Sequence, residues 1–337
     1  MTQQSHGKII TSPFKPAWWA KNRHIQTIWP RYLQRRQKVS LTSQRLELPD
    51  GDFVDLSWTP KPTNSKGIAV LFHGLEGSAR SHYARDMLAV MAQKGWHAVL
   101  MHFRGCSDSP NRLQRAYHSG DTGDALYLLK WLSEKYPSTH LVTLGFSLGA
   151  NMLLKLLGEN RGSRLVDAAV CVSPPFKLAE CSSAVNMGFS KNYQKYLLNS
   201  MVRKLKQKMS FMDYSQHLSI LSNDINKLRT FRDFDEQVTS KLHGFKDAND
   251  YYQQCSAVAY TRQIDTPTLV IHAKDDPFMN EKVIPTENEL SDKITVELSE
   301  HGGHVGFLQG TPWCPKVWLH RRVPEYFDDI LNNKVTA

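Results

Sequence analysis

A glycine-flanked serine gives the clearest chemical signal in the sequence, in Gly-Phe-Ser-Leu-Gly at 145–149. An apolar stretch typical of a buried strand precedes it at 140–144, and a stretch with helical periodicity follows at 150–157. The two glycines lack the Cβ atoms that would clash where a strand reverses sharply into a helix. Ser147 is therefore predicted to project from a sheet edge as a nucleophile, and the free N–H groups of the helix that follows would face a developing oxyanion.

A serine nucleophile needs a base and an acid. Lys-Asp-Asp-Pro-Phe at 274–278 follows a predicted strand at 267–273, and it offers Asp275 or Asp276 as the acid. The carboxyl ends of parallel strands share one edge of a sheet. An acid in this segment could therefore reach the serine.

Histidines follow the next predicted strand, at 294–298. Ser-Glu-His-Gly-Gly-His at 299–304 offers His301 or His304 as the base. A metal site at these two histidines would need carboxylate or cysteine partners, and the sequence offers no identifiable set. We expect neither a metal ion nor another cofactor.

The strand predicted at 67–72 ends in His-Gly-Leu-Glu-Gly-Ser at 73–78. A glycine-rich exit from a strand beside a nucleophile is where a second backbone donor to an oxyanion would lie, and the N–H of Leu75 is the candidate. The alternative is an ordinary turn between a strand and a helix. Only the neighbouring serine motif favours the functional interpretation.

Strands and helices alternate along much of the chain, which predicts a mostly parallel sheet with helices on both faces. The predicted strands are a hairpin at 41–48 and 52–58, then 67–72, 97–103, 140–144, 168–173, 267–273 and 294–298. The predicted helices outside the cap are at 83–94, 121–135, 150–157 and 323–331. We expect three regions: an N-terminal arm (1–40), a core (41–175 and 264–337) and a helical cap inserted into that core (176–263).

Composition is that of an ordinary globular protein, with 337 residues, 41% hydrophobic and 22% charged. No apolar run has the length of a membrane span, and the first residues lack the apolar centre of a signal peptide. The five cysteines are scattered, which fits reduced thiols. These features predict a cytoplasmic location.

The arm at 1–40 mixes tryptophans with lysines and arginines, and the net charge of the chain is +10. Such a segment could lie on an anionic membrane, stack on nucleic-acid bases or pack on the core as a strap. The strap is favoured because the apolar residues form no regular stripe. No nucleic-acid-binding motif is present, so nucleic acid is not an expected partner, whereas peripheral contact with an anionic membrane stays open.

Several motifs together resemble one family. They are Phe-His-Gly-Leu-Glu-Gly-Ser, Phe-Arg-Gly-Cys-Ser, Tyr-His-Ser-Gly-Asp-Thr, Gly-Phe-Ser-Leu-Gly-Ala-Asn, Asp-Asp-Pro-Phe, His-Gly-Gly-His-Val-Gly-Phe and the N-terminal Asn-Arg-His-Ile-Gln-Thr-Ile. The chain order of serine, acid and histidine is that of α/β-hydrolases. More narrowly, the sequence resembles the YheT-like hydrolases, bacterial relatives of eukaryotic acylglycerol lipases and phospholipases.

The resemblance implies an α/β-hydrolase fold with a mostly parallel eight-stranded sheet, helices on both faces and a helical cap. It implies Ser147 as nucleophile, His304 as base and Asp276 as acid, with the N–H groups of Leu75 and Leu148 as the oxyanion hole. Asp276 is preferred to Asp275 because Asp-Pro-Phe resembles the family's acid position. His304 is preferred to His301 because Gly-Gly-His matches the family's histidine.

The expected activity is that of a serine carboxylesterase on short- to medium-chain acyl esters, with monoacylglycerol among the candidate substrates. Phospholipase or thioesterase activity at membrane surfaces is an alternative. A third hypothesis is a non-catalytic basic binding protein on a hydrolase scaffold. The complete set of serine, acid and histidine argues against that hypothesis.

Overall fold

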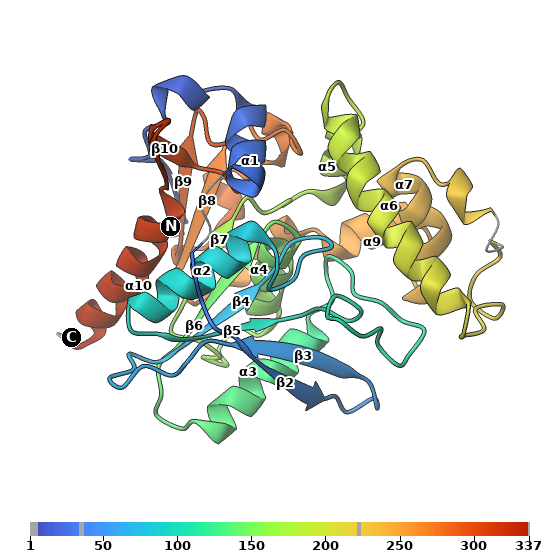
Figure 1. Cartoon of the computed structure of the whole chain (residues 1–337), viewed down its shortest axis with the longest axis horizontal. Coiled ribbons are helices and arrows are strands. Elements are labelled where there is room, and N and C mark those ends of the chain that lie inside the picture. The colour runs from blue at the N-terminus through green and yellow to red at the C-terminus, as the bar shows by residue number, and fades with distance from the viewer. Residues whose placement is uncertain (1–5, 34–36, 221–223, 336–337) are drawn as a thin grey trace, which may run out of the picture.

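The computed structural model describes residues 6–33, 37–220 and 224–335, and its centre is a nine-stranded sheet. The strand order is β1-β9-β8-β7-β6-β4-β5-β3-β2 (Figure 1). The strands are β1 (Lys8–Thr11), β2 (Thr42–Glu47), β3 (Phe53–Trp58), β4 (Ile68–Phe72), β5 (His97–Met101), β6 (Leu141–Phe146), β7 (Ala168–Val172), β8 (Thr268–Ala273) and β9 (Ile294–Ser299). Only β2–β3 and β3–β5 pair antiparallel in this sheet. The predicted fold class is confirmed.

The expected number of eight strands was wrong, because the arm contributes a ninth. Strand β1 pairs in parallel with β9 and forms one edge of the sheet. It has only four residues with mostly exposed side chains, and its partner is distant in sequence, so no local pattern marked it. A separate hairpin of β10 (Leu308–Thr311) and β11 (Cys314–Val317) was also not predicted.

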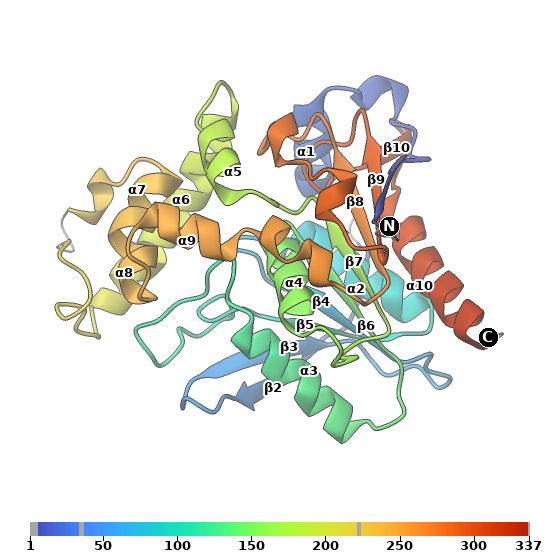
Figure 2. The ribbon, with the colours of Figure 1, turned by 180° about the vertical axis from the view of Figure 1, so that it is seen from behind.

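Two pairs of helices cover the sheet. Helices α2 (His82–Gln93) and α10 (Leu319–Val335) pack on one face, and α3 (Gly123–Lys135) and α4 (Leu148–Glu159) pack on the other (Figures 1 and 2). Strand β4 is apolar throughout because its alternate side chains enter two different cores, one on each face of the sheet. The predicted core helices lie within a few residues of their observed bounds.

The region predicted as a cap, 176–263, contains no strand among its described residues. Its helices are α5 (Leu178–Ala184), α6 (Ser190–Met209), α7 (Phe231–Phe234), α8 (Ser240–Leu242) and α9 (Ala248–Cys255), with a π-helical turn η3 (Asp235–Thr239). They enclose two apolar clusters of their own and stand to one side of the sheet (Figure 2). Short 3-10 turns are η1 (Trp18–Ala20), η2 (Ile225–Lys227), η4 (Ala257–Ala259), η5 (Thr261–Gln263), η6 (Glu281–Val283) and η7 (Glu287–Glu289).

The described part of the predicted arm forms β1, η1 and helix α1 (Arg23–Tyr32) and contacts the core. The Asn22 side chain caps α1 by accepting hydrogen bonds from the backbone of His24 and Ile25. Residues 1–5 and 34–36 of this region lie outside the described residues. Throughout the described ranges, every helix is too short or too polar to cross a membrane.

Candidate active site

Ser147 lies at the sharp turn between β6 and α4, as the sequence predicts. Its backbone has φ 52° and ψ −118°, a conformation that costs a non-glycine residue roughly 1–3 kcal/mol. The flanking glycines allow the turn: a Cβ on Gly145 would lie 2.6 Å from Ala150 Cα, and one on Gly149 would lie 2.5 Å from the carbonyl oxygen of Phe72. The strained serine is thus held by close backbone contacts on both sides.

Ser147, His304 and Asp276 form a hydrogen-bonded chain. Ser147 Oγ lies 2.9 Å from His304 Nε2, and His304 Nδ1 lies 2.7 Å from Asp276 Oδ2. Their positions follow from topology, because β6, β8 and β9 are parallel and end at the same edge of the sheet. Asp276 is almost fully buried, and the His304 side chain is 11% exposed. In this arrangement, His304 can take a proton from the serine and Asp276 can stabilise the resulting imidazolium.

The alternative acid and base, Asp275 and His301, contact each other. Asp275 accepts a hydrogen bond of 2.9 Å from the N–H of Gly303, and its other oxygen lies 3.3 Å from His301 Nδ1. Burial raises the pKa of Asp275. This second pair joins the loop after β8 to the loop after β9, so its contacts are those of a loop brace.

Two groups that we had not predicted as site residues hold His304 and its loop. The Phe278 ring stacks on the imidazole with centroids 4.2 Å apart, and the Phe278 N–H donates to Asp276 Oδ1 at 2.8 Å. The buried Ser173 hydroxyl accepts a hydrogen bond from the N–H of Val305. Phe278 was visible as part of the Asp-Asp-Pro-Phe motif, whereas Ser173 carried no signal because it contacts a loop 132 residues away.

The two predicted oxyanion donors flank Ser147. Leu148 is the first residue of α4, so its N–H lies at the positive end of that helix. Leu75 follows Gly74, and a Cβ on Gly74 would lie only 3.2 Å from Ser147 Cβ. The loop of Leu75 therefore runs directly beside the serine.

The side chains of Tyr83 and the buried His73 fix this loop. The Gly74 N–H donates to the Tyr83 hydroxyl at 2.8 Å. His73 Nδ1 lies 2.7 Å from the Gly74 carbonyl oxygen, and His73 Nε2 accepts from the N–H of Phe103 at 3.1 Å. Burial lowers the pKa of His73 to about 3. His73 is thus neutral, with its proton on Nδ1 and directed at Gly74.

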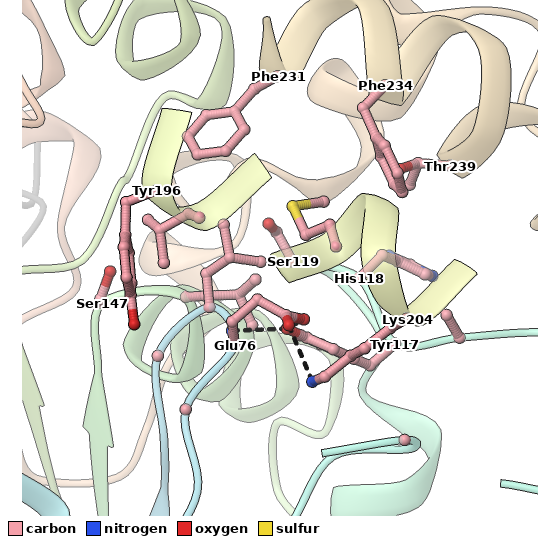
Figure 3. Close-up of a pocket in the computed structure, with 18 of the residues that line it drawn as sticks. Glu76, Tyr117, His118, Ser119, Ser147, Tyr196, Lys204, Phe231, Phe234 and Thr239 are labelled. Atoms are coloured by element: carbon pink, nitrogen blue, oxygen red, sulfur yellow. Dashed lines mark hydrogen bonds and ion pairs between the residues drawn. The ribbon is translucent and has the colours of Figure 1, made fainter. Parts of the chain in front are cut away.

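A cavity of about 870 Å³ opens at Ser147 and extends between the core and the helices of 176–263. In Figure 3, Phe231 and Phe234 enter it from these helices on the side opposite Glu76 and Tyr117. Its apolar lining includes Met201, Leu205, Phe231, Phe234 and Val238. The cavity therefore offers a reacting carbonyl at Ser147 an adjoining apolar space.

A buried carboxylate links the two walls of the cavity. Glu76, the residue after Leu75, lies 2.9 Å from Lys204 Nζ (Figure 3). It accepts hydrogen bonds from the hydroxyls of Ser200 and Tyr117. Lys204 and Ser200 belong to α6. The ion pair therefore joins helix α6 to the oxyanion loop.

Helix α1 supplies another part of the cavity wall. Arg31 donates to the Tyr196 hydroxyl at 2.5 Å, and His24 Nδ1 lies 3.0 Å from the Tyr193 hydroxyl. Both tyrosines are on α6.

Within the described ranges, no cluster of three or more histidine, cysteine, aspartate or glutamate side chains has the arrangement of a metal site.

Comparison with known proteins identifies the family. Residues 70–311 match the family model described as the alpha/beta hydrolase fold. The chain belongs to the alpha/beta hydrolase family. It is an enzyme of the esterase and lipase type within that family, as its relatives indicate.

Among these relatives is the Escherichia coli protein named "Putative esterase YheT", 45% identical over 326 residues that cover 96% of this chain and 95% of the relative. This confirms the resemblance to YheT-like hydrolases. A Saccharomyces cerevisiae monoacylglycerol lipase is 29% identical, over 79% of this chain and 61% of the yeast protein. The Pyrococcus furiosus esterase Pf2001 shares the fold, with a TM-score of 0.58 and 15% identity over 98% of both chains.

Proposed function

We propose that this α/β hydrolase cleaves carboxylic esters by forming an acyl-enzyme on Ser147. The observation that carries the proposal is the chain of hydrogen bonds from Ser147 Oγ through His304 to Asp276, with distances of 2.9 Å and 2.7 Å. These contacts lie in the range of good hydrogen bonds, and the base already touches the nucleophile.

In the first half of the reaction, His304 Nε2 removes the proton from Ser147 as Oγ attacks the ester carbonyl. Asp276 holds the proton on Nδ1 and stabilises the imidazolium. The N–H groups of Leu75 and Leu148 bind the oxyanion, and His304 then protonates the leaving alcohol. In the second half, His304 activates a water molecule that releases the acid.

The cavity supports an ester with an acyl chain of short to medium length. Its volume of about 870 Å³ is that of a site for a small molecule, and part of its lining is apolar. Each buried methylene would contribute roughly 0.8 kcal/mol of binding until the space is filled. The name of the yeast relative, monoacylglycerol lipase, makes monoacylglycerol a candidate substrate.

A panel of esters with graded chain length tests this function, with monoacylglycerols, phospholipids and acyl thioesters included. We expect hydrolysis of simple esters, with kcat/KM rising with chain length and then levelling off. The Ser147→Ala variant is the control and should be inactive on every substrate. Activity confined to phospholipids or thioesters would support the alternative, and no activity on any compound would contradict the proposal.

Peripheral contact with an anionic lipid surface is a second candidate property. The exposed side chains at the mouth of the cavity favour it. Large apolar side chains are exposed on α1 and around the start of α6, namely Ile25, Tyr32, Leu33, Met187, Phe189 and Tyr196. Exposed cations accompany them, namely Lys21, Arg23, Lys191 and Lys195. Apolar and basic side chains together suit the headgroup region of an anionic membrane.

Co-sedimentation with vesicles tests this contact. Vesicles containing phosphatidylserine should retain the protein, and purely phosphatidylcholine vesicles should retain it less. The Tyr32→Ser/Phe189→Ser variant should lose binding, whereas Trp313→Ser removes an exposed aromatic at the tip of the β10–β11 hairpin and serves as the matched control. Equal retention of both variants would contradict the assignment of this surface.

A further inference from the structure

Helix α1 of the arm lies directly on the loop that carries His304, although Thr27 and His304 are 277 residues apart. Two glycines of the loop allow this approach. A Cβ on Gly306 would lie 2.0 Å from the carbonyl oxygen of Gln26, and one on Gly303 would lie 2.6 Å from that of Arg23. Figure 1 shows α1, in blue, beside the part of the sheet that contains β8 and β9, in orange.

The hydroxyl of Thr27 contacts the backbone of His304 itself. It accepts a hydrogen bond of 3.0 Å from the His304 N–H and donates one of 2.8 Å to the carbonyl oxygen of Arg23. Because its proton is used within α1, the hydroxyl presents a lone pair to His304. The helix therefore fixes the direction of that backbone amide.

The buried side chain of Gln26 holds the far end of the same loop. Its Oε1 accepts from the N–H of Leu308, and its Nε2 donates to the carbonyl oxygens of Leu308 and Ala20. The loop between these anchors is strained, since Val305 has φ 62° and Phe307 has φ 46°. Such conformations persist only where surrounding contacts impose them.

We propose that Thr27 is a positioning residue for His304, and that the arm thereby forms part of the catalytic machinery. The inference rests on the proposed role of His304 as base. The imidazole must stay within hydrogen-bond distance of Ser147 Oγ and Asp276 Oδ2 at once, so a small shift of its backbone would lengthen both contacts. Misplacement by about 1 Å can cost on the order of 100-fold in rate.

The test compares Thr27→Val, which loses the hydroxyl, with Thr27→Ser, which keeps it. Thr27→Val should lower kcat about tenfold or more, with little change in KM, and should shift the pH at which kcat/KM is half-maximal. Thr27→Ser should behave like the wild type. Thr311→Val removes a comparable hydroxyl, which accepts from the Cys314 N–H in the β10–β11 hairpin, and should leave kcat unchanged.

Melting temperature separates positioning from stability. A lower Tm for Thr27→Val with wild-type kcat, KM and pH profile would overturn the inference. If Thr27→Val fails to fold, Thr27→Cys replaces it, and kcat equal to that of Thr27→Ser would overturn the inference equally. If Ser147→Ala is inactive and Thr27→Val has the kinetic constants of the wild type, only this inference is rejected. An active Ser147→Ala would reject the proposed function.

Discussion

The ammonium of Lys204 lies 2.9 Å from the carboxylate of Glu76, one residue after the predicted oxyanion donor Leu75. The Glu76 side chain is 6% exposed and that of Lys204 is 33% exposed. Charge–charge pairing across the two walls of the cavity therefore couples the placement of α6 to the oxyanion loop.

Removing one partner of this pair should be worse than removing both. Lys204→Met leaves the Glu76 carboxylate with fewer partners in a buried site, and we expect a loss of about 1–3 kcal/mol in the free energy of unfolding together with lower kcat/KM. Lys204→Met/Glu76→Gln should recover part of that stability. Urea unfolding of both variants checks this, and additive losses would show that the two groups are not coupled.

The contacts of the two neighbouring aspartates predict different effects on catalysis. Asp276→Asn should reduce kcat/KM by orders of magnitude, because an amide can hold His304 in the wrong tautomer and cannot stabilise its charge. Asp275→Asn keeps an acceptor for the Gly303 N–H. The loss of transition-state stabilisation calculated from its kcat/KM should therefore be only about 1 kcal/mol. Measuring kcat/KM and Tm for both variants on one ester decides this, and a larger catalytic loss at Asp275 would reverse the assignment.

His73 should make the protein sensitive to acid. Its pKa in the fold is about 3, below the 6.5 of an unperturbed histidine, so its stabilising contribution is complete above pH 6.5 and is lost as the pH falls from 6.5 towards 3. The His73→Asn variant lacks this titration. Between these limits, the free energy of unfolding of the wild type should fall more steeply than that of the variant, by about 1.4 kcal/mol per pH unit. Parallel curves would mean that His73 does not titrate between the two states.

Local sequence signals were enough to predict those site residues whose positions are set by one strand and the turn that follows it. Ser147 was predicted because the glycine spacing, the apolar strand and the helix start are all contained in one short stretch. The ambiguity between Asp275 and Asp276 could be narrowed only by resemblance, because adjacent residues share the same strand end. Their distances to His304 and Gly303 depend on side-chain directions in the fold.

Contacts between distant segments could not be predicted. Strand β1 was missed because its pairing with β9 gives four residues no distinctive pattern. The Asn-Arg-His-Ile-Gln-Thr-Ile segment was noticed only as a resemblance, and nothing in it indicates that Thr27 reaches His304. The eight-strand expectation failed for the same reason, since the arm was considered apart from the sheet.

Ser147 and His304 should act as a unit. Ser147→Ala and His304→Ala should each remove nearly all ester hydrolysis, and the double variant should be hardly slower than either single variant. Rate constants for one ester, measured at high enzyme concentration, test this. Losses that multiply would count against a shared proton-transfer step.

The central claim is that Ser147 is a base-activated nucleophile, and labelling by a fluorophosphonate tests it most directly. The wild type should be labelled rapidly at Ser147, as peptide mass spectrometry of the adduct would show. Labelling should be abolished in Ser147→Ala and greatly slowed in His304→Ala. Rapid labelling of Ser147→Ala, or an adduct on another residue of the wild type, would contradict the claim.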